Sequence, residues 1–372
     1  MNITEVVTYT IAPRNRRREE LSFCNVLFCL LVLFIHISAE PVEGYARDSV
    51  LYFLAVGFWR LSSFVVQGYF FLSGIRLFLS GRQETAGAFY LGRCRRVVLP
   101  YAVVFCLFAL YFHLSGTASF TPAELLVQFL NGKICGHFYY VILICQFYLL
   151  MPLWQRIIRK TNIFLGLLTS LMIMLMSKVY MPELIGFLTG QDFADNGLLF
   201  TSYLFYFIAG TYCGLYYDRF RIFLDRYRRS LLFTWLGLGA VNWIFFWLRS
   251  RGVYWASWLE LFHVLYCMYA VLACLSLGYL WREKKVFRTS LFRAADKWSY
   301  HVYLLHPLVI FMGNSLFRHL GLSSLSLRFL LRTVLVYGVM TGFVWLLGKL
   351  PSGKYPGSRL TSHRLGIGTK KK

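Results

Sequence analysis

Long apolar blocks, separated by short charged stretches, dominate the sequence. The first block runs from Leu21 to Ser38 without a formal charge, and about 20 apolar residues in a helix are enough to cross a bilayer. Blocks of similar length follow, and their apolar residues do not form the narrow stripes of helices in soluble proteins. The pattern therefore predicts an all-α, polytopic transmembrane helical bundle.

We expect about ten spans. After the first, they lie at about 58–79, 97–114, 137–154, 163–179, 199–217, 231–248, 254–281, 298–317 and 327–347. An amphipathic segment at 122–132 is expected at the membrane interface. The sixth span contains Gly210 and Gly214, a spacing that allows two helices to approach closely.

We assign residues 21–349 to one transmembrane domain between two short basic ends. The cytoplasmic leader is 1–20, and the cytoplasmic tail is 350–372, which finishes in three lysines. The leader lacks the apolar core and following small residues of a cleavable signal peptide, so we expect the first span to be an uncleaved anchor.

The composition, 58% hydrophobic and 15% charged, is typical of a membrane protein and not of a soluble domain. The net charge of +23 does not predict a nucleic-acid partner, because the basic residues stand between apolar blocks. If Met1 is cytoplasmic, 30 of the 39 Lys and Arg residues lie on the cytoplasmic side and nine on the outer side. That asymmetry follows the positive-inside rule and predicts that both termini are cytoplasmic.

The nine cysteines show no CxxC pair and no metal-ligand spacing. The sequence therefore predicts neither a disulfide framework nor a metal site.

One ionisable side chain, His36, lies near the outer end of the first span, and Glu40 follows at a spacing of four residues. An imidazole inside a membrane helix is costly unless it is paired or used. We therefore take His36 as a candidate catalytic group, with Glu40 as a candidate to orient its ring and stabilise the imidazolium. The alternative is a structural histidine that is hydrogen-bonded to a neighbouring helix.

A basic cluster, Arg93-Cys94-Arg95-Arg96, stands at the cytoplasmic start of the third span. Arginine forks suit phosphate, so a diphosphate-bearing ligand such as coenzyme A or a nucleotide-sugar would fit. A positive-inside anchor that contacts lipid headgroups would produce the same pattern.

Two further spans carry polar and aromatic side chains in unusual number. In the ninth span, helical spacing puts Ser299, Tyr303 and His306 on one face, and Pro307 marks a local break. The fourth span opens with histidine and tyrosines on the outer side, where an aromatic belt is the alternative explanation. The candidate substrate-binding residues are His137, Tyr140, Ser299, Tyr303 and His306.

Taken in order, these motifs resemble the acyltransferase family 3 membrane proteins. The landmarks are 18–21, His36, Phe70-Phe71-Leu72-Ser73-Gly74, 89–96 with Pro100-Tyr101, 137–140 and 299–307. The resemblance implies a bacterial plasma-membrane enzyme that moves an acyl group, expected to be acetyl, from acyl-CoA to a hydroxyl or amine, commonly on a surface glycan. It implies that His36 is the catalytic histidine, that Arg93 and Arg96 are the family's paired arginines, and that no cofactor is bound permanently.

The chain departs from the family at one place. The family often has a Leu-Asp-x-Leu-Arg run whose arginine lies about eleven residues before the histidine. Here Ser22 and Asn25 stand at the aspartate and arginine positions, so the role of that arginine does not carry over.

These observations predict a division of labour across the membrane. The arginines lie at the inner face and His36 lies about 20 Å away on helix rise, a gap that a pantetheine arm could bridge. His36 would take the proton of an acceptor hydroxyl as a general base; whether an acyl-histidine forms stays open.

A rival interpretation is a transporter of a glycan or lipid-linked precursor, with His36, Tyr303 and His306 along its path. Transporters often show internal repeats and paired broken helices, and the sequence suggests neither. A membrane anchor or sensor would leave the buried histidines unexplained.

Overall fold

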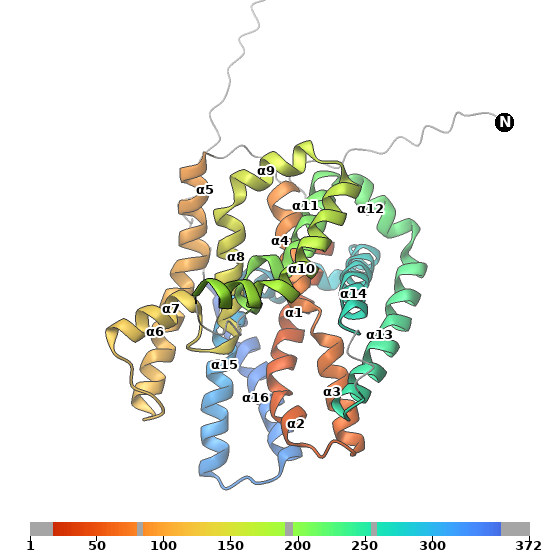
Figure 1. The fold of residues 1–372 in the computed structure, drawn as a ribbon. Helices are drawn as coiled ribbons and strands as arrows, with labels where there is room; N and C mark the ends of the chain where they lie inside the picture. Colours follow the sequence, from red (N-terminus) through yellow and green to blue (C-terminus); the bar gives the residue numbers. More distant parts are fainter. Residues whose placement is uncertain (1–17, 80–84, 190–195, 254–258, 351–372) are drawn as a thin grey trace, which may run out of the picture.

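A computed structural model describes residues 18–79, 85–189, 196–253 and 259–350. All regular secondary structure in these ranges is helical, which confirms the predicted all-α membrane bundle (Figure 1). Nearly all of the expected basic leader and tail lies outside the described residues, so the division at 20 and 350 stays a prediction.

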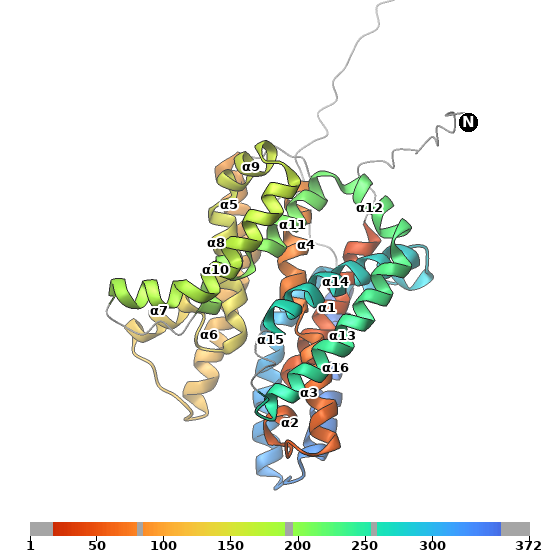
Figure 2. The same ribbon diagram turned by 45° about the vertical axis from the view of Figure 1, so that its right-hand side comes forward.

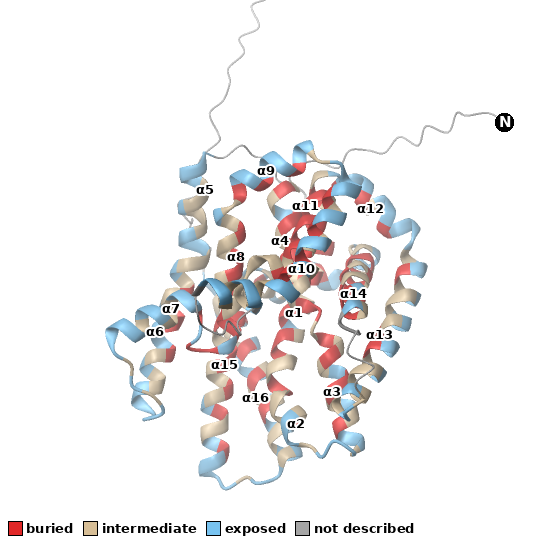
Figure 3. Ribbon diagram, in the orientation of Figure 1, coloured by how far each residue is buried: buried red, intermediate tan, exposed pale blue. Residues whose placement is uncertain are grey.

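Helix α1 (Glu19–Ile37) lies at the centre of the bundle. Two glutamates in its first turn suit the positive end of the helix dipole. Cys24, Phe28 and Ile37 on α1 are completely buried, and Figure 3 shows buried positions on this helix in red. The helices that pack most closely on α1 are α2 (Ala39–Gly44), α3 (Val50–Ser62), α4 (Val65–Leu79), α14 (Leu259–Trp281), α15 (Ser290–His319) and α16 (Leu325–Lys349). The candidate base His36 is therefore held in the last turn of a helix that other helices surround.

Helix α4 packs against α11 (Leu204–Leu215) through glycines on both sides. A Cβ added at Gly210 would lie 2.1 Å from the carbonyl oxygen of Phe71, and one at Gly74 would lie 2.4 Å from that of Phe207. Only residues without a side chain permit backbones to come this close. The predicted close approach at Gly210 and Gly214 is confirmed.

The third predicted span begins earlier than expected. Helix α5 (Ala86–Arg93), a π-helical segment (Cys94–Val98) and α6 (Leu99–Leu114) form one continuous helical stretch. Pro100 has no N–H for the carbonyl of Arg96 and crowds it. The wider turn relieves this, since Leu99 N–H bonds instead to the carbonyl of Cys94, five residues earlier. The sequence placed the start at about 97 because the basic cluster hides the helical periodicity before it.

The remaining helices fall into two groups. Figure 2 shows α5 to α10 on one side and α1, α3 and α13 to α16 on the other, with α4 and α11 between them. The other helices in this arrangement are α7 (Pro122–Asn131), α8 (Tyr139–Leu149), α9 (Met151–Lys160), α10 (Ile163–Thr189), α12 (Tyr217–Arg226) and α13 (Arg228–Ser250). The amphipathic segment predicted at 122–132 is helix α7, which opens with a capping box between Thr121 and Glu124.

The predicted segments fall on helical stretches, but 58–79 covers the end of α3 and all of α4, and 137–154 crosses from α8 into α9. Residues 254–258 of the eighth predicted segment lie outside the described residues, and the number of crossings stays a prediction. Among the described residues, seven helical stretches are long and apolar enough to cross a membrane, or eight if α8 and α9, bent by 62° relative to each other, form one span. Large apolar side chains are exposed on the outer faces, such as Leu110 on α6 and Leu165 on α10. Such a surface is expected against lipid, and the chain is a multi-pass membrane protein.

Candidate active site

Three histidines from distant parts of the chain meet in the core. They are His36 on α1, His137 in the short 3-10 turn before α8, and His306 on α15. The ring centroid of His36 lies 5.0 Å from that of His306 and 6.0 Å from that of His137, and the latter two are 5.4 Å apart. His306 and His137 are buried, whereas His36 is half-buried. We call these residues the histidine cluster.

The hydrogen bonds of His137 use both of its ring nitrogens. Nε2 contacts the carbonyl oxygen of Leu304 at 3.2 Å, and Nδ1 contacts Sγ of Cys135 at 3.2 Å. Because a carbonyl can only accept, Nε2 must carry the proton, and the thiol then donates to Nδ1. His137 is thereby fixed in orientation and in tautomer.

Tyr303 joins the histidine cluster to a polar pocket. Its hydroxyl donates to the backbone carbonyl of His137, and its ring centroid lies 5.3 Å from that of His137 and 5.6 Å from that of Tyr140. The structure therefore brings together the sequence-predicted residues His36, His137, Tyr140, Tyr303 and His306.

The polar pocket has a volume of about 260 Å³ and lies between the two groups of helices. Arg76, Arg96 and Lys297 supply its positive charges, and Tyr303 and Ser299 also line it. One pocket thus connects a predicted arginine with a residue that touches the histidine cluster.

A neighbouring pocket contains both predicted arginines. Arg93 and Arg96 line it together with Arg76. The Arg93 guanidinium stands over the rings of Phe89 and Tyr148, at 5.0 and 4.8 Å from their centroids, which fixes its direction. Sequence reasoning missed Arg76, which lines both pockets. Its only signal was an arginine two residues after the Gly74 motif, and the positive-inside rule explains that equally well.

The residues at the family's Asp and Arg positions face α15. Asn25 Nδ2 lies 2.9 Å from Oδ1 of Asp296 and 2.8 Å from Oγ of Ser299, and Ser22 Oγ donates to Oδ2 of Asp296 over 2.8 Å. Asn25, Asp296 and Ser299 also line the polar pocket. The neutral amide of Asn25 thus holds the carboxylate of Asp296, a residue that sequence reasoning missed.

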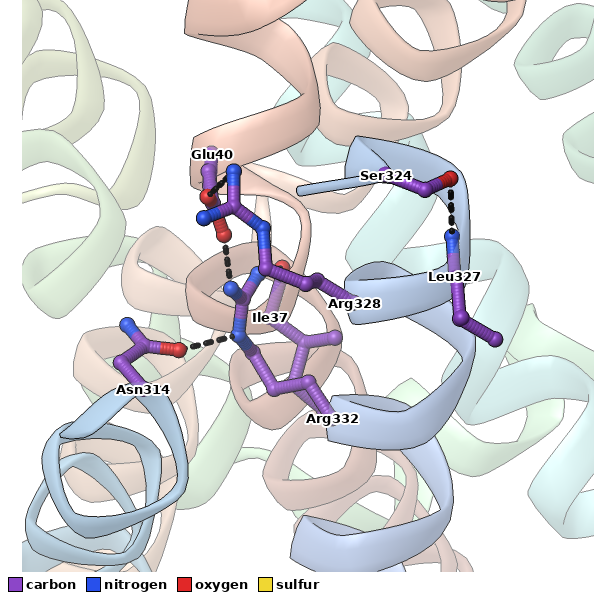
Figure 4. A network of polar contacts seen from close by, with 7 residues as sticks. All are labelled: Ile37, Glu40, Asn314, Ser324, Leu327, Arg328 and Arg332. Carbon is purple, nitrogen blue, oxygen red and sulfur yellow. Dashed lines mark hydrogen bonds and ion pairs between the residues drawn. The ribbon is translucent and has the colours of Figure 1, made fainter. Parts of the chain in front are cut away.

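Glu40 contacts arginines rather than His36. Helix α1 ends at Ile37, so Glu40 belongs to α2 and does not share a continuous helix face with His36. Its carboxylate forms ion pairs with Arg332 and, at 2.7 Å, with Arg328 (Figure 4). Within the described ranges we find no hydrogen bond between Glu40 and His36, so its predicted catalytic role stays a prediction.

Arg332 is the centre of this network. It is 1% exposed, and besides Glu40 it donates to Oδ1 of Asn314 at 2.9 Å and to the backbone carbonyl of Ile37 at 3.2 Å (Figure 4). Because the last carbonyls of a helix lack partners within it, Arg332 caps the end of α1 that carries His36. Nothing in the sequence pattern pairs α16 with this end of α1.

Across the described part of the chain, no group of three or more His, Cys, Asp or Glu residues is arranged to hold a metal ion.

Comparison with known proteins identifies a family and several relatives. A sequence model described as "Acyltransferase domain" (Acyl_transf_3) matches residues 20–349. A Staphylococcus aureus protein (strain Mu50) named "Probable poly-beta-1,6-N-acetyl-D-glucosamine export protein" is 22% identical, and the match covers 90% of this chain and 97% of that protein. A Bacillus subtilis protein (strain 168) named "Putative membrane-bound acyltransferase YfiQ" is 22% identical, and the match covers 79% of this chain and 82% of that protein. No solved structure matches the chain.

Proposed function

The chain belongs to the Acyltransferase domain family and is a multi-pass membrane acyltransferase, and on that premise we propose that it moves an acetyl group from acetyl-CoA to a hydroxyl of a cell-surface glycan. The observation that carries the proposal is the polar pocket, which reaches from Arg96 to Tyr303 beside the histidine cluster. It offers phosphate-binding charge at one end and a candidate base near the other.

The donor would bind with its phosphates at Arg76, Arg93 and Arg96. Several guanidinium groups around one pocket suit a diphosphate, because each presents fixed donors to phosphoryl oxygens. The pantetheine arm would run through the polar pocket past Ser299 and Tyr140 and bring the thioester toward the histidine cluster. Acetyl-CoA is then a substrate and not a resident cofactor.

His36 would act as the general base, because it is half-buried and within the described ranges neither of its ring nitrogens has a hydrogen-bond partner. It takes the proton of the acceptor hydroxyl as the oxygen attacks the thioester carbonyl carbon. The new C–O bond forms, the C–S bond breaks, and the proton passes to the coenzyme A sulfur. His137 and Tyr303 would shape the acceptor side, and Glu40 would act through Arg332 on the end of α1.

The test is transfer of radiolabelled acetyl from acetyl-CoA to envelope glycan in membranes that contain the protein. His36→Ala and His36→Gln should both abolish transfer while acetyl-CoA binding persists, because only the chemical step loses its base. Gln keeps hydrogen bonding without basicity, so rescue by Gln would assign His36 a structural role. Transfer by a well-folded His36→Ala protein would refute the proposed base.

A second candidate function is glycan export, which the printed name of the S. aureus relatives favours. In that case cells that lack this protein would retain polysaccharide inside, and His36→Gln would impair release as well, because His36 would line the transport path. Normal release of unacetylated polysaccharide by the His36→Gln strain would instead support the acyltransferase.

A further inference from the structure

Pro307 leaves one backbone carbonyl in α15 without its usual partner. Proline has no N–H, so the carbonyl of Tyr303, four residues earlier, loses its helical donor. His306 Nδ1 lies 2.8 Å from this oxygen and 3.2 Å from the carbonyl of Val302. A carbonyl oxygen only accepts, so Nδ1 carries the ring proton. In the neutral imidazole, Nε2 therefore presents a lone pair.

This lone pair has no partner in the described part of the chain. Nε2 of His306 is buried without a hydrogen bond, and the whole residue is 0% exposed. An unsatisfied buried acceptor destabilises the resting protein. A donor that approaches Nε2 during the reaction would satisfy it. Apo enzymes often hold such pairs too long for a hydrogen bond, and substrate binding tightens them.

The neighbouring rings decide which donor that is. His137 directs its Nε2–H to the carbonyl of Leu304 and accepts from Cys135 at Nδ1, so it has no proton to offer. Tyr303 donates its hydroxyl to His137. The His36 ring is closer to His306 than the other two rings are, with 5.0 Å between centroids.

Resting on the proposed function, we propose that His306 Nε2 accepts a hydrogen bond from the ring N–H of His36 and so positions the base. The bond leaves the other nitrogen of His36 free to take the hydroxyl proton. It also stabilises the imidazolium until that proton moves to the departing sulfur. His306 gains no proton itself and is a positioning residue. This role is the one that sequence reasoning had assigned to Glu40.

Substitutions of His306 separate this acceptor role from a role in packing. His306→Leu removes the acceptor, and we expect kcat to fall about 100-fold with KM for acetyl-CoA unchanged. His306→Gln keeps an acceptor oxygen and should recover about tenfold of that loss. Wild-type kcat in His306→Leu would reduce His306 to packing. A Gln variant as inactive as the Leu variant would overturn the acceptor role.

Pro307→Ala tests the cause of the arrangement. Alanine returns an N–H to the Tyr303 carbonyl and competes with Nδ1 of His306, so kcat should fall about tenfold in the wild-type background and not at all in His306→Leu. Pro182→Ala, the same change inside α10, is the matched control and should leave kcat unchanged. Equal effects of Pro307→Ala in both backgrounds would refute the link.

A readout without turnover keeps this inference distinct from the proposed function. Nitrogen-15 NMR of histidine-labelled protein should show one ring with Nδ1 protonated and Nε2 bare, and that signal should vanish in His306→Leu. If wild-type protein transfers no acetyl group, the proposed function fails. An Nε2-protonated His306 would overturn the present inference whatever the transfer assay shows.

Discussion

The Arg332 guanidinium donates a hydrogen bond of 3.2 Å to the backbone carbonyl of Ile37, which lies 295 positions earlier in the chain and next to His36. A buried arginine in a membrane bundle needs a counter-charge, and Glu40 supplies it. The orientation of the candidate base therefore depends on a cap that comes from α16.

We predict that Arg332→Met destabilises the protein by about 1.5–3 kcal/mol, because it removes charge-assisted hydrogen bonds from the end of α1 and leaves Glu40 with Arg328 alone. Acetyl transfer should fall as well. Arg328→Met is the matched control: it removes the other partner of Glu40, is more exposed, and does not touch Ile37 among the contacts described. Thermal unfolding in detergent gives the comparison, and equal losses in both variants would argue against a cap on α1.

The arginines of the two pockets should determine donor affinity. Arg76→Ala, Arg93→Ala and Arg96→Ala should each weaken acetyl-CoA binding roughly ten- to a hundredfold, since one charge-assisted phosphate contact contributes about 1.5–3 kcal/mol. Arg95 lies next to Arg96 in the π-helical segment, is exposed and lines neither pocket. Arg95→Ala therefore serves as the control. Calorimetric titration with acetyl-CoA measures this, and a loss in Arg95→Ala as large as in the others would indicate a general charge effect.

Gly210→Ala should lower the free energy of unfolding by about 1–3 kcal/mol. The added Cβ would lie 2.1 Å from the carbonyl oxygen of Phe71, so α4 and α11 must move apart. Gly237→Ala on α13 meets nothing within 4 Å and should leave the melting temperature unchanged. A Gly210→Ala protein as stable as wild type would mean that the two helices are farther apart than described.

The topology makes a prediction of its own. We expect Met1, Lys372 and the Arg93 region on the cytoplasmic side, because of the positive-inside asymmetry. In Figure 1, α9 and α12, which carry three basic residues each, lie at one end of the bundle, and α2 lies at the opposite end. Reporter fusions at Lys372 decide the question; an outer location would overturn both the ten-span count and the proposed direction of transfer.

The sequence predicted the helices well because apolar blocks and family motifs are local signals. It also singled out His36, His137, Tyr303 and His306, since histidines and tyrosines inside spans are costly, and the structure brings them together. Their chemical roles remain predictions, as local patterns say nothing about which ring nitrogen carries a proton.

Pairings between distant segments were beyond the sequence. Glu40 is four residues from His36, and helical periodicity suggested a shared face, but the helix ends at Ile37. The partners that replaced that contact come from α16, which a single sequence cannot position. Asp296 and Arg76 were missed for the same reason: each acquires its meaning only where α1, α4 and α15 meet.

The π-helical segment at Cys94–Val98 contains one residue more than an α-helix would use over the same length. Because each residue turns an α-helix by about 100°, that extra residue sets the rotational phase of α5 against α6. Deleting a single residue within the segment would leave both helices intact. It would, however, swing Phe89, Tyr90 and Arg93 away from the pocket that they share with Arg96. In this protein a one-codon deletion could therefore disconnect donor recognition without unfolding any element.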